Sequence, residues 1–296
     1  MSASDAMVRV LRTIEPMQQE VTAADGHRIV ARFFAPVEKT VGAILIVPAM
    51  GTSQFYYGPL ATWAADQGFL AATFDYRGTG LSRPLDLRGF KADILDWGRL
   101  DCGAMADALS KRAPGKPLYW IGHSLGGQIL PFVPNRDRIA KAVTIATGSG
   151  YWLEYAPSLR WRAWWLWYVV APLSVWLFGY FPGKRLRKVG DLPKGVMEQW
   201  RRWCLDPEYA VGVEGESVRA QYAAVRTPIV SFSFSDDEFM SARNTESMHE
   251  FYINAPRAMK RFAPKDVGLK RIGHFGFFRS ENADALWRRH LLPELT

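Results

Sequence analysis

The sequence contains little cysteine: Cys102 and Cys204 are the only two in 296 residues. So few cysteines give no disulfide framework, which suits a reducing compartment. The first residues, 1–16, carry charged side chains and no long apolar core, so they do not have the pattern of a secretory signal. We therefore expect a cytoplasmic protein.

The chain also lacks internal repeats, low-complexity tracts and nucleic-acid-binding motifs. Its net charge of +8 would suit a nucleic acid, a membrane surface or an acidic ligand. Without a matching motif we expect no nucleic-acid partner. Apolar residues make up 48% of the chain, which excludes global disorder, and the length suits one large α/β domain or two small ones.

Short apolar runs alternate with segments of helical spacing along most of the chain. Continuous apolar runs are typical of strands buried on both faces of a parallel sheet. We expect strands at residues 18–22, 27–34, 41–47, 69–74, 118–121, 139–146, 228–234 and 257–262. We expect helices at residues 57–66, 92–112, 125–132, 242–252 and 283–291. The alternation predicts an α/β fold with a mostly parallel central sheet flanked by helices.

Residues 119–127 combine a short apolar strand with a Gly-X-Ser-X-Gly motif centred on Ser124. Such a serine lies on a sharp strand-to-helix turn in a backbone conformation that side chains disfavour. Gly122 and Gly126 lack a Cβ, so strand and helix can approach closely there. The helix start aims backbone N–H groups at the place where an oxyanion would form. We therefore predict Ser124 as a catalytic nucleophile and the Leu125 N–H as one oxyanion donor.

A serine nucleophile needs a base within hydrogen-bond reach, and the base needs an orienting carboxylate. In folds with this elbow the acid and then the histidine follow the serine along the chain. Among the five histidines, only His274 stands in a loop after a strand with glycine on both sides. The others stand in a hairpin, beside the serine or on helices: His27, His123, His249 and His290. We predict His274 as the base and expect the His123 side chain to point elsewhere.

Two adjacent carboxylates, Asp236 and Asp237, follow the strand at 228–234. The usual arrangement is an acid, a short apolar pair and then a helix N-cap. Asp237 fits this frame one residue better, so we predict it as the acid of the triad. Asp236 is the alternative, and we expect the residue that is not the acid to cap the turn.

Four motifs resemble those of the α/β-hydrolase superfamily, and within it the serine-aminopeptidase-like and monoacylglycerol-lipase-like hydrolases. They are Gly-His-Ser-Leu-Gly-Gly at 122–127, Asp-Tyr-Arg-Gly-Thr-Gly-Leu-Ser at 75–82, Pro-Ala-Met-Gly at 48–51 and Ile-Gly-His-Phe-Gly-Phe-Phe-Arg at 272–279. The resemblance covers residues 15–150 and 215–294. It implies hydrolysis of an ester, amide or thioester through an acyl-enzyme, with no metal and no cofactor. Many relatives have His-Gly-X where this chain has Pro48-Ala49-Met50, and this correspondence makes the Met50 N–H the second oxyanion donor.

Residues 151–214 have a different composition. From 152 to 203 the chain carries eight of its twelve tryptophans, and between 152 and 205 it has nine Lys or Arg against three Asp or Glu. We expect a helical lid (cap) insert over the site, whose tryptophans line an apolar acyl pocket. A lid that also rests on a membrane surface is the alternative, because Trp and Tyr favour the interface and basic residues bind anionic headgroups.

Residues 163–182 contain no charge and could span a bilayer on length alone. Pro172 and Gly179 interrupt this stretch. A single span would also place Ser124 before the membrane and His274 after it, although the two must meet. We therefore expect no transmembrane segment.

These observations predict a serine hydrolase that acts on a small-molecule carboxylic ester with an apolar acyl chain. An acyltransferase or an amide or peptide hydrolase on the same fold is an alternative. Some acyltransferases of this fold carry His-X-X-X-X-Asp at the elbow, and Gln128 stands at that place here. A non-catalytic binding protein is the competing class. Neither the oligomeric state nor the natural substrate follows from the sequence.

Overall fold

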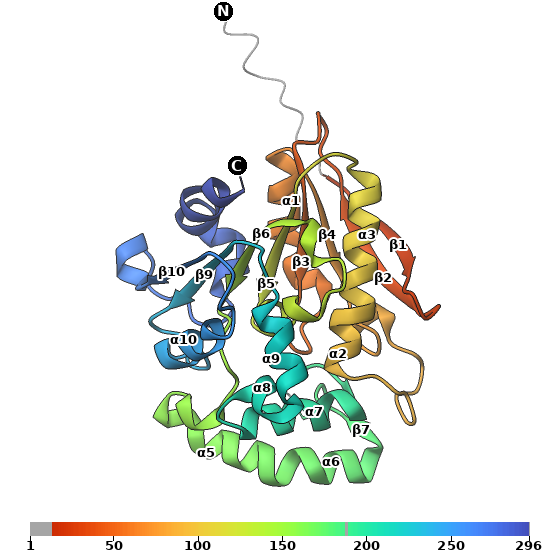
Figure 1. Ribbon diagram of the computed structural model, residues 1–296, viewed down its shortest axis with the longest axis vertical. Helices are drawn as coiled ribbons and strands as arrows, with labels where there is room; N and C mark the ends of the chain where they lie inside the picture. Colours follow the sequence, from red (N-terminus) through yellow and green to blue (C-terminus); the bar gives the residue numbers. More distant parts are fainter. Residues whose placement is uncertain (1–13, 187–188, 296) are drawn as a thin grey trace, which may run out of the picture.

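A computed structural model describes residues 14–186 and 189–295. Most of the N-terminal stretch for which we expect no secretory signal, residues 1–13, lies outside the described residues. The core is an eight-stranded sheet with the order β1-β2-β4-β3-β5-β6-β9-β10 (Figure 1). β1 pairs antiparallel with β2, β2 antiparallel with β4, and the other neighbours are parallel. The α/β fold with a mostly parallel sheet is confirmed.

The eight expected strands are all present, with bounds that differ by at most two residues. They are β1 Met17–Thr22, β2 Arg28–Phe34, β3 Gly42–Val47, β4 Phe69–Phe74, β5 Leu118–His123, β6 Ile139–Ile145, β9 Ile229–Phe234 and β10 Arg257–Phe262. Every residue of β3, β4, β5 and β9 is buried. This is why these strands have apolar runs rather than an alternating pattern.

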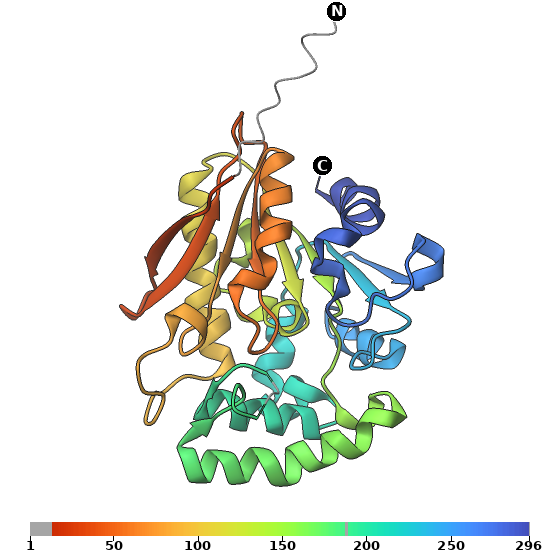
Figure 2. The same cartoon turned by 180° about the vertical axis from the view of Figure 1, so that it is seen from behind.

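The two faces of the sheet bury different side chains. Along β3, Leu45 belongs to the core on one face and Ile44 to the core on the other, because successive strand residues point to opposite sides. The first core is covered by α3 Gly103–Arg112 and α9 Glu216–Ala223. The second is covered by α1 Gly58–Asp66 and the π-helix Ala283–Leu291. The sheet thus has helices on both faces, as Figures 1 and 2 show.

The helix after the elbow is shorter than the expected 125–132. α4 spans Leu125–Gln128, and a separate 3₁₀ helix covers Leu130–Phe132. Pro131 lies in that second segment and has no N–H to donate, so the α-helical ladder does not continue through it. The expected helix at 92–112 is present as α2 Ile94–Asp96, the π-helix Trp97–Cys102 and α3 in succession.

The insert, meaning residues 151–214 between β6 and α9, is mostly helical. Its longest element is an uninterrupted helical run, made of α5 Pro157–Trp165, the π-helix Leu166–Val170 and α6 Ala171–Phe178. We call this run the outer helix. It lies at the end of the molecule opposite the termini (Figure 1). β7 Tyr180–Phe181, β8 Leu192–Pro193, α7 Lys194–Leu205 and α8 Tyr209–Glu214 complete the insert before α9.

Of the two residues expected to interrupt the uncharged stretch, only Gly179 does so. It ends the outer helix in a left-handed conformation, with φ of 73°. Pro172 lies inside this run, just after the π-helix Leu166–Val170, and the helical run continues through it. A search of the described residues for a helix with the length and apolar character of a membrane span finds none.

Candidate active site

Ser124 occupies the strained turn that the motif predicts. It follows β5 directly and has φ of 52° and ψ of −113°, a conformation that costs free energy in a residue other than glycine. Its N–H donates to the Ile145 carbonyl at 2.9 Å. A Cβ on Gly122 would lie 2.5 Å from the Gly126 carbonyl oxygen, and one on Gly126 would lie 2.2 Å from that of Val47. The two glycines therefore permit the close approach of strand and helix around the serine.

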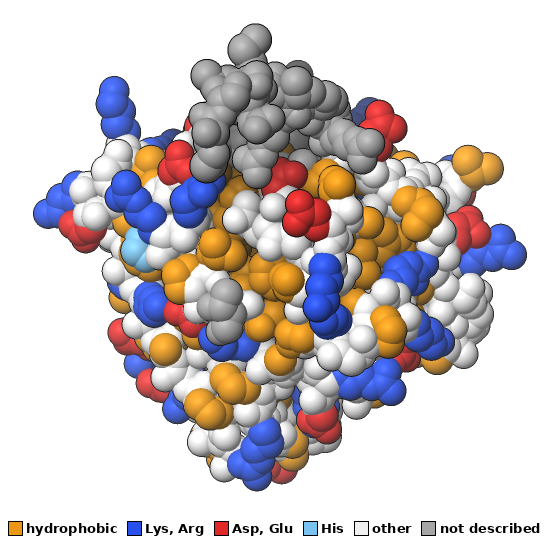
Figure 3. All heavy atoms as spheres, turned by 90° about the horizontal axis from the view of Figure 1, so that it is seen from above, with side chains coloured by type: hydrophobic (Ala, Val, Ile, Leu, Met, Phe, Trp, Pro, Cys, Tyr) orange, Lys and Arg blue, Asp and Glu red, His pale blue; other side chains and the backbone are white. Residues whose placement is uncertain are grey.

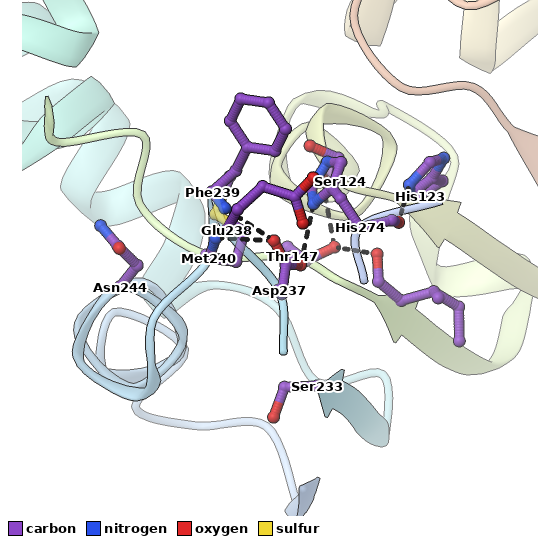
Figure 4. A network of polar contacts seen from close by, with 12 residues as sticks. His123, Ser124, Thr147, Ser233, Asp237, Glu238, Phe239, Met240, Asn244 and His274 are labelled. Carbon is purple, nitrogen blue, oxygen red and sulfur yellow. Dashed lines mark hydrogen bonds and ion pairs between the residues drawn. The ribbon is translucent and has the colours of Figure 1, made fainter. Parts of the chain in front are cut away.

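His274 and Asp237 come together at the same edge of the sheet (Figure 4). His274 Nδ1 lies 2.8 Å from Asp237 Oδ2, and both side chains are almost fully buried. Asp237 Oδ1 accepts from the N–H groups of Phe239 at 2.8 Å and Met240 at 3.0 Å. These bonds stabilise an ionised carboxylate and fix its second oxygen toward the imidazole. With its proton held on Nδ1, the ring presents a free lone pair at Nε2.

The structure separates the two adjacent carboxylates. Asp236 Oδ2 accepts from the Ile272 N–H at 2.8 Å and thereby holds the loop that carries His274. It is Asp237 that reaches the imidazole. In the described residues, no hydrogen bond joins the Ser124 hydroxyl to His274, whose backbone carbonyl lies 3.0 Å from Nε2 of His123, the residue before the serine. Such bonds are often long without substrate and tighten in the complex.

The two backbone amides expected at an oxyanion site belong to Leu125, at the start of α4, and to Met50, in the loop after β3. Neither the Met50 N–H nor the Leu125 N–H donates to another residue in the described ranges. The loop that carries Met50 is fixed on both sides. The Tyr76 hydroxyl donates to the Pro48 carbonyl at 2.9 Å, and the Ala49 N–H donates to the Tyr57 hydroxyl at 2.8 Å.

The His123 ring lies between Tyr57 and the loop of His274, a position that the sequence did not predict. Its Nδ1 lies 2.8 Å from the Tyr57 hydroxyl, and its Nε2 lies 3.0 Å from the backbone carbonyl of His274. Because that carbonyl can only accept, Nε2 carries the proton and Nδ1 accepts from Tyr57. Burial, reinforced by His274, lowers the pKa of His123 well below its usual range, so the ring stays neutral. His123 and Tyr57 thus join the elbow, the His274 loop and the Ala49 amide.

The remaining histidines have other surroundings. His249 is buried in α10 Ala242–Glu250, where Nδ1 lies 2.7 Å from the Thr245 carbonyl and Nε2 lies 2.9 Å from the Thr144 hydroxyl. His27 stacks near Phe90, and His290 near Phe262. Among the described residues, no group of three or more His, Cys, Asp or Glu side chains could hold a metal ion.

Aromatic side chains surround the imidazole of His274. The ring centroids of Phe239 and Phe275 lie 5.2 and 5.1 Å from it, and both side chains are partly exposed. Phe239 in turn contacts Tyr155 of the insert at 6.4 Å. A separate cavity of about 300 Å³ lies beside Gly51 and is lined by core loops and by residues of the insert. The candidate site therefore has an apolar rim to which the insert contributes.

A parallel sheet with helices on both faces, a strained serine after β5, and an Asp–His pair after later strands define an α/β-hydrolase. Comparison with known proteins agrees with this class. A family model for serine aminopeptidase S33 matches residues 38–198, which is more than half of the chain. The chain belongs to this family.

Several solved structures have the same fold at low sequence identity. A soluble variant of monoglyceride lipase from Saccharomyces cerevisiae, in complex with a substrate analogue, is 17% identical with a TM-score of 0.67, over 96% of each chain. An esterase from Pyrococcus furiosus is 15% identical with a TM-score of 0.61, over 96% of this chain and 90% of its own. An acylaminoacyl peptidase from Pyrococcus horikoshii is 14% identical with a TM-score of 0.60, over 99% of this chain and 43% of its own. None of the curated proteins compared with the chain matches it.

Proposed function

We propose that the protein is a serine hydrolase in which Ser124 is the nucleophile, His274 the general base and acid, and Asp237 the residue that orients His274. The observation that carries this proposal is the 2.8 Å bond between His274 Nδ1 and Asp237 Oδ2, at the same edge of the sheet as the strained serine. A buried acid–imidazole pair beside a serine elbow suits acyl transfer.

The mechanism has four steps and uses no cofactor. His274 Nε2 takes the Ser124 proton as Oγ attacks the acyl carbonyl carbon. The carbonyl oxygen becomes an oxyanion, which the Met50 and Leu125 N–H groups bind. As the bond to the leaving group breaks, His274 returns the proton to the departing oxygen and leaves an acyl-enzyme. His274 then takes a proton from a water molecule as the water oxygen attacks the acyl carbon. The bond between that carbon and Ser124 Oγ breaks, His274 returns the proton to Oγ, and the carboxylic acid leaves.

We propose a carboxylic ester with an apolar acyl chain as the substrate. Phe239 and Phe275 place apolar surface beside His274, and Tyr155 extends that surface into the insert. A monoglyceride lipase and an esterase share the fold, which is consistent with an ester. In this proposal residues 151–214 form a lid over the core residues 15–150 and 215–294, and Tyr155 joins the lid to Phe239 at the site.

The exposed tryptophans of the insert have another place. Trp161, Trp165 and Trp176 lie on the outer surface, so we do not assign them to an acyl pocket. Trp167 and Trp203 are buried in the packing of the insert itself. The tryptophans therefore do not line one common pocket: Trp152, Trp161 and Trp164 line a surface hollow of about 290 Å³, whereas the others are at least partly buried or stand on the outer surface.

Amide hydrolysis is the second candidate, because the family model is described as a serine aminopeptidase and a peptidase shares the fold. An acyltransferase is disfavoured by Gln128, which is tied up in packing: it donates to the Gly148 carbonyl at 2.6 Å and accepts from the Tyr209 hydroxyl at 2.9 Å. Its side chain is an amide, so it does not provide the carboxylate that such acyltransferases have at that place.

The test is covalent labelling of the pure protein with a fluorophosphonate probe, combined with turnover of p-nitrophenyl butyrate and of the matching anilide. Ser124→Ala should abolish labelling and turnover. Ser231→Ala is the matched control, because its buried hydroxyl lies inside β9 and forms no hydrogen bond with a described residue. Labelling that persists in Ser124→Ala would refute the nucleophile, and an anilide turned over better than the ester would favour the amide reaction.

A further inference from the structure

The outer helix, Pro157–Phe178, exposes a continuous apolar stripe to solvent. The members of the stripe are Trp161, Trp165, Tyr168, Leu173, Trp176 and Leu177. They lie on one side of the helix, because they follow one another at intervals of four, three, five, three and one residues. Trp161 is 69% and Trp176 is 79% exposed, so two of the largest apolar side chains stand almost free in water. An exposed patch of this kind marks a binding surface.

The opposite side of the same helix is already packed. Ala163, Trp167, Ala171 and Val175 are buried at intervals of four residues. Trp167 meets Trp200 of α7 edge to face, with ring centroids 4.9 Å apart. The helix is therefore held in place by its inner side, and the stripe is not needed for that packing. Something other than the fold accounts for three outward tryptophans.

The stretch of chain that carries the stripe has charges of one sign. From residue 155 to residue 190 the sequence has no Asp or Glu and six Lys or Arg. Four of the six are exposed at the two ends of the outer helix: Arg160, Arg162, Lys184 and Arg185. None of these four forms a salt bridge with a described residue. The other two, Arg187 and Lys188, lie outside the described residues.

The opposite end of the molecule has a different surface. Figure 3 looks at that end and shows basic and acidic side chains interspersed. In the sequence, residues 152–205 have nine Lys or Arg against three Asp or Glu, a surplus of six in a net charge of +8, so most of the positive surplus belongs to the insert that carries the tryptophans. Exposed tryptophan and tyrosine side chains on one helix, with basic residues near its two ends that form no salt bridge with a described residue, match the chemistry of a bilayer interface with anionic headgroups.

We propose that the outer helix lies in the interface of an anionic lipid bilayer, with the stripe between headgroups and acyl chains and the basic residues against phosphates. A second copy of the chain is a poorer occupant, because two copies meeting on this face would bring the like charges of both together. The inference stands apart from the proposed catalysis, since none of its residues belongs to the triad.

The test is sedimentation of the purified full chain with vesicles of phosphatidylcholine alone or mixed with phosphatidylglycerol. Binding should require phosphatidylglycerol and fall as salt rises, because salt screens exposed charges. The triple variant Trp161→Gln, Trp165→Gln, Trp176→Gln should weaken binding about tenfold or more. Neutralising Arg160, Arg162, Lys184 and Arg185 to Gln should weaken binding by about fivefold per residue.

Two matched controls remove the same chemistry elsewhere. The triple variant Val37→Gln, Val41→Gln, Ile253→Gln replaces exposed apolar residues of the core, distant in the chain from the outer helix. The quadruple variant of exposed lysines changes Lys39, Lys111, Lys116 and Lys265 to Gln. Both should bind vesicles nearly as the parent does, apart from a small loss with net charge. Ser124→Ala should bind unchanged, which separates this inference from the proposed function.

A direct measurement covers the case in which the tryptophan variant is unstable. Phosphatidylcholine brominated on its acyl chain, mixed with phosphatidylglycerol, should quench the tryptophan fluorescence of the unmodified protein on binding. Protein that stays in the supernatant at low salt would overturn the proposal. Equal losses of vesicle binding in the stripe variant and its control would also overturn it. So would a protein that binds no vesicles and that light scattering shows to be a dimer, if the stripe variant is a monomer.

Discussion

Replacing Asp237 with asparagine tests the orientation of His274 directly. The amide oxygen can still accept from Phe239 and Met240, so the side-chain NH₂ then faces His274 Nδ1. Two donors cannot share a hydrogen bond, so the imidazole must keep its proton on Nε2 and present a lone pair at Nδ1. Nε2 is the atom that should take the Ser124 proton, and the base is lost although its position is kept. By analogy with serine proteases we expect kcat to fall about 10⁴-fold, or about 5 kcal/mol.

Asp236→Asn is the matched control, because it changes the neighbouring carboxylate in the same way. Asp236 holds the Ile272 N–H with one oxygen, and an amide oxygen can replace that acceptor. We expect kcat to fall less than about tenfold, because the imidazole keeps its tautomer. The assay is p-nitrophenyl ester turnover at saturating substrate, with thermal unfolding to verify that both variants fold. Equal losses in both variants, or a larger loss in Asp236→Asn, would refute the assignment of Asp237.

Three further predictions concern the network, the pH dependence and the substrate. Tyr57→Phe removes the hydroxyl that bonds both the Ala49 N–H and His123 Nδ1, so urea unfolding should show that the free energy of unfolding falls by about 2–4 kcal/mol. Ester assays should show a lower kcat/KM, and an unchanged kcat/KM would mean that the network is only structural. Burial lowers the pKa of His249 from 6.5 to about 4, so the unfolded chain binds a proton at a higher pH than the folded chain, and the free energy of unfolding should fall by about 3 kcal/mol as pH drops from 6.5 to 4. A plot of that free energy against pH should have a smaller slope in His249→Gln, and equal slopes would contradict the buried neutral ring. Along p-nitrophenyl esters from acetyl to medium chains, kcat/KM should rise about fourfold per methylene, or about 0.8 kcal/mol, until the apolar site is full, and a flat profile would mean a small polar site.

The local signals of the sequence predicted most of the core. Strands buried on both faces are recognised as apolar runs. The elbow is recognised by glycines at fixed offsets from Ser124, because side chains there would clash. The choice between Asp236 and Asp237 also followed from local spacing, and the structure pairs Asp237 with His274. These features could be predicted because each is decided within one short segment.

Features that depend on distant segments were missed. His123 contacts Tyr57 and the His274 carbonyl, which are 66 and 151 residues away in sequence. We predicted a helix through residue 132 from the apolar run, whereas α4 ends at Gln128, shortly before Pro131. In the outer helix, apolar residues occur on all sides, so periodicity could not tell which side would be buried.

Asn244 shows how the insert and the site form one unit. It lies on α10, directly after the loop of Asp237, and its Nδ2 lies 3.2 Å from Glu154 Oε2 and 3.4 Å from the Tyr151 carbonyl at the start of the insert. Another contact, between Tyr155 and Phe239, brings the insert to the ring next to His274. The chemistry resides in loops that esterases, lipases and peptidases of this fold can share. The properties that would set this chain apart, its apolar rim and its exposed stripe, therefore depend on how the insert is anchored to the acid loop.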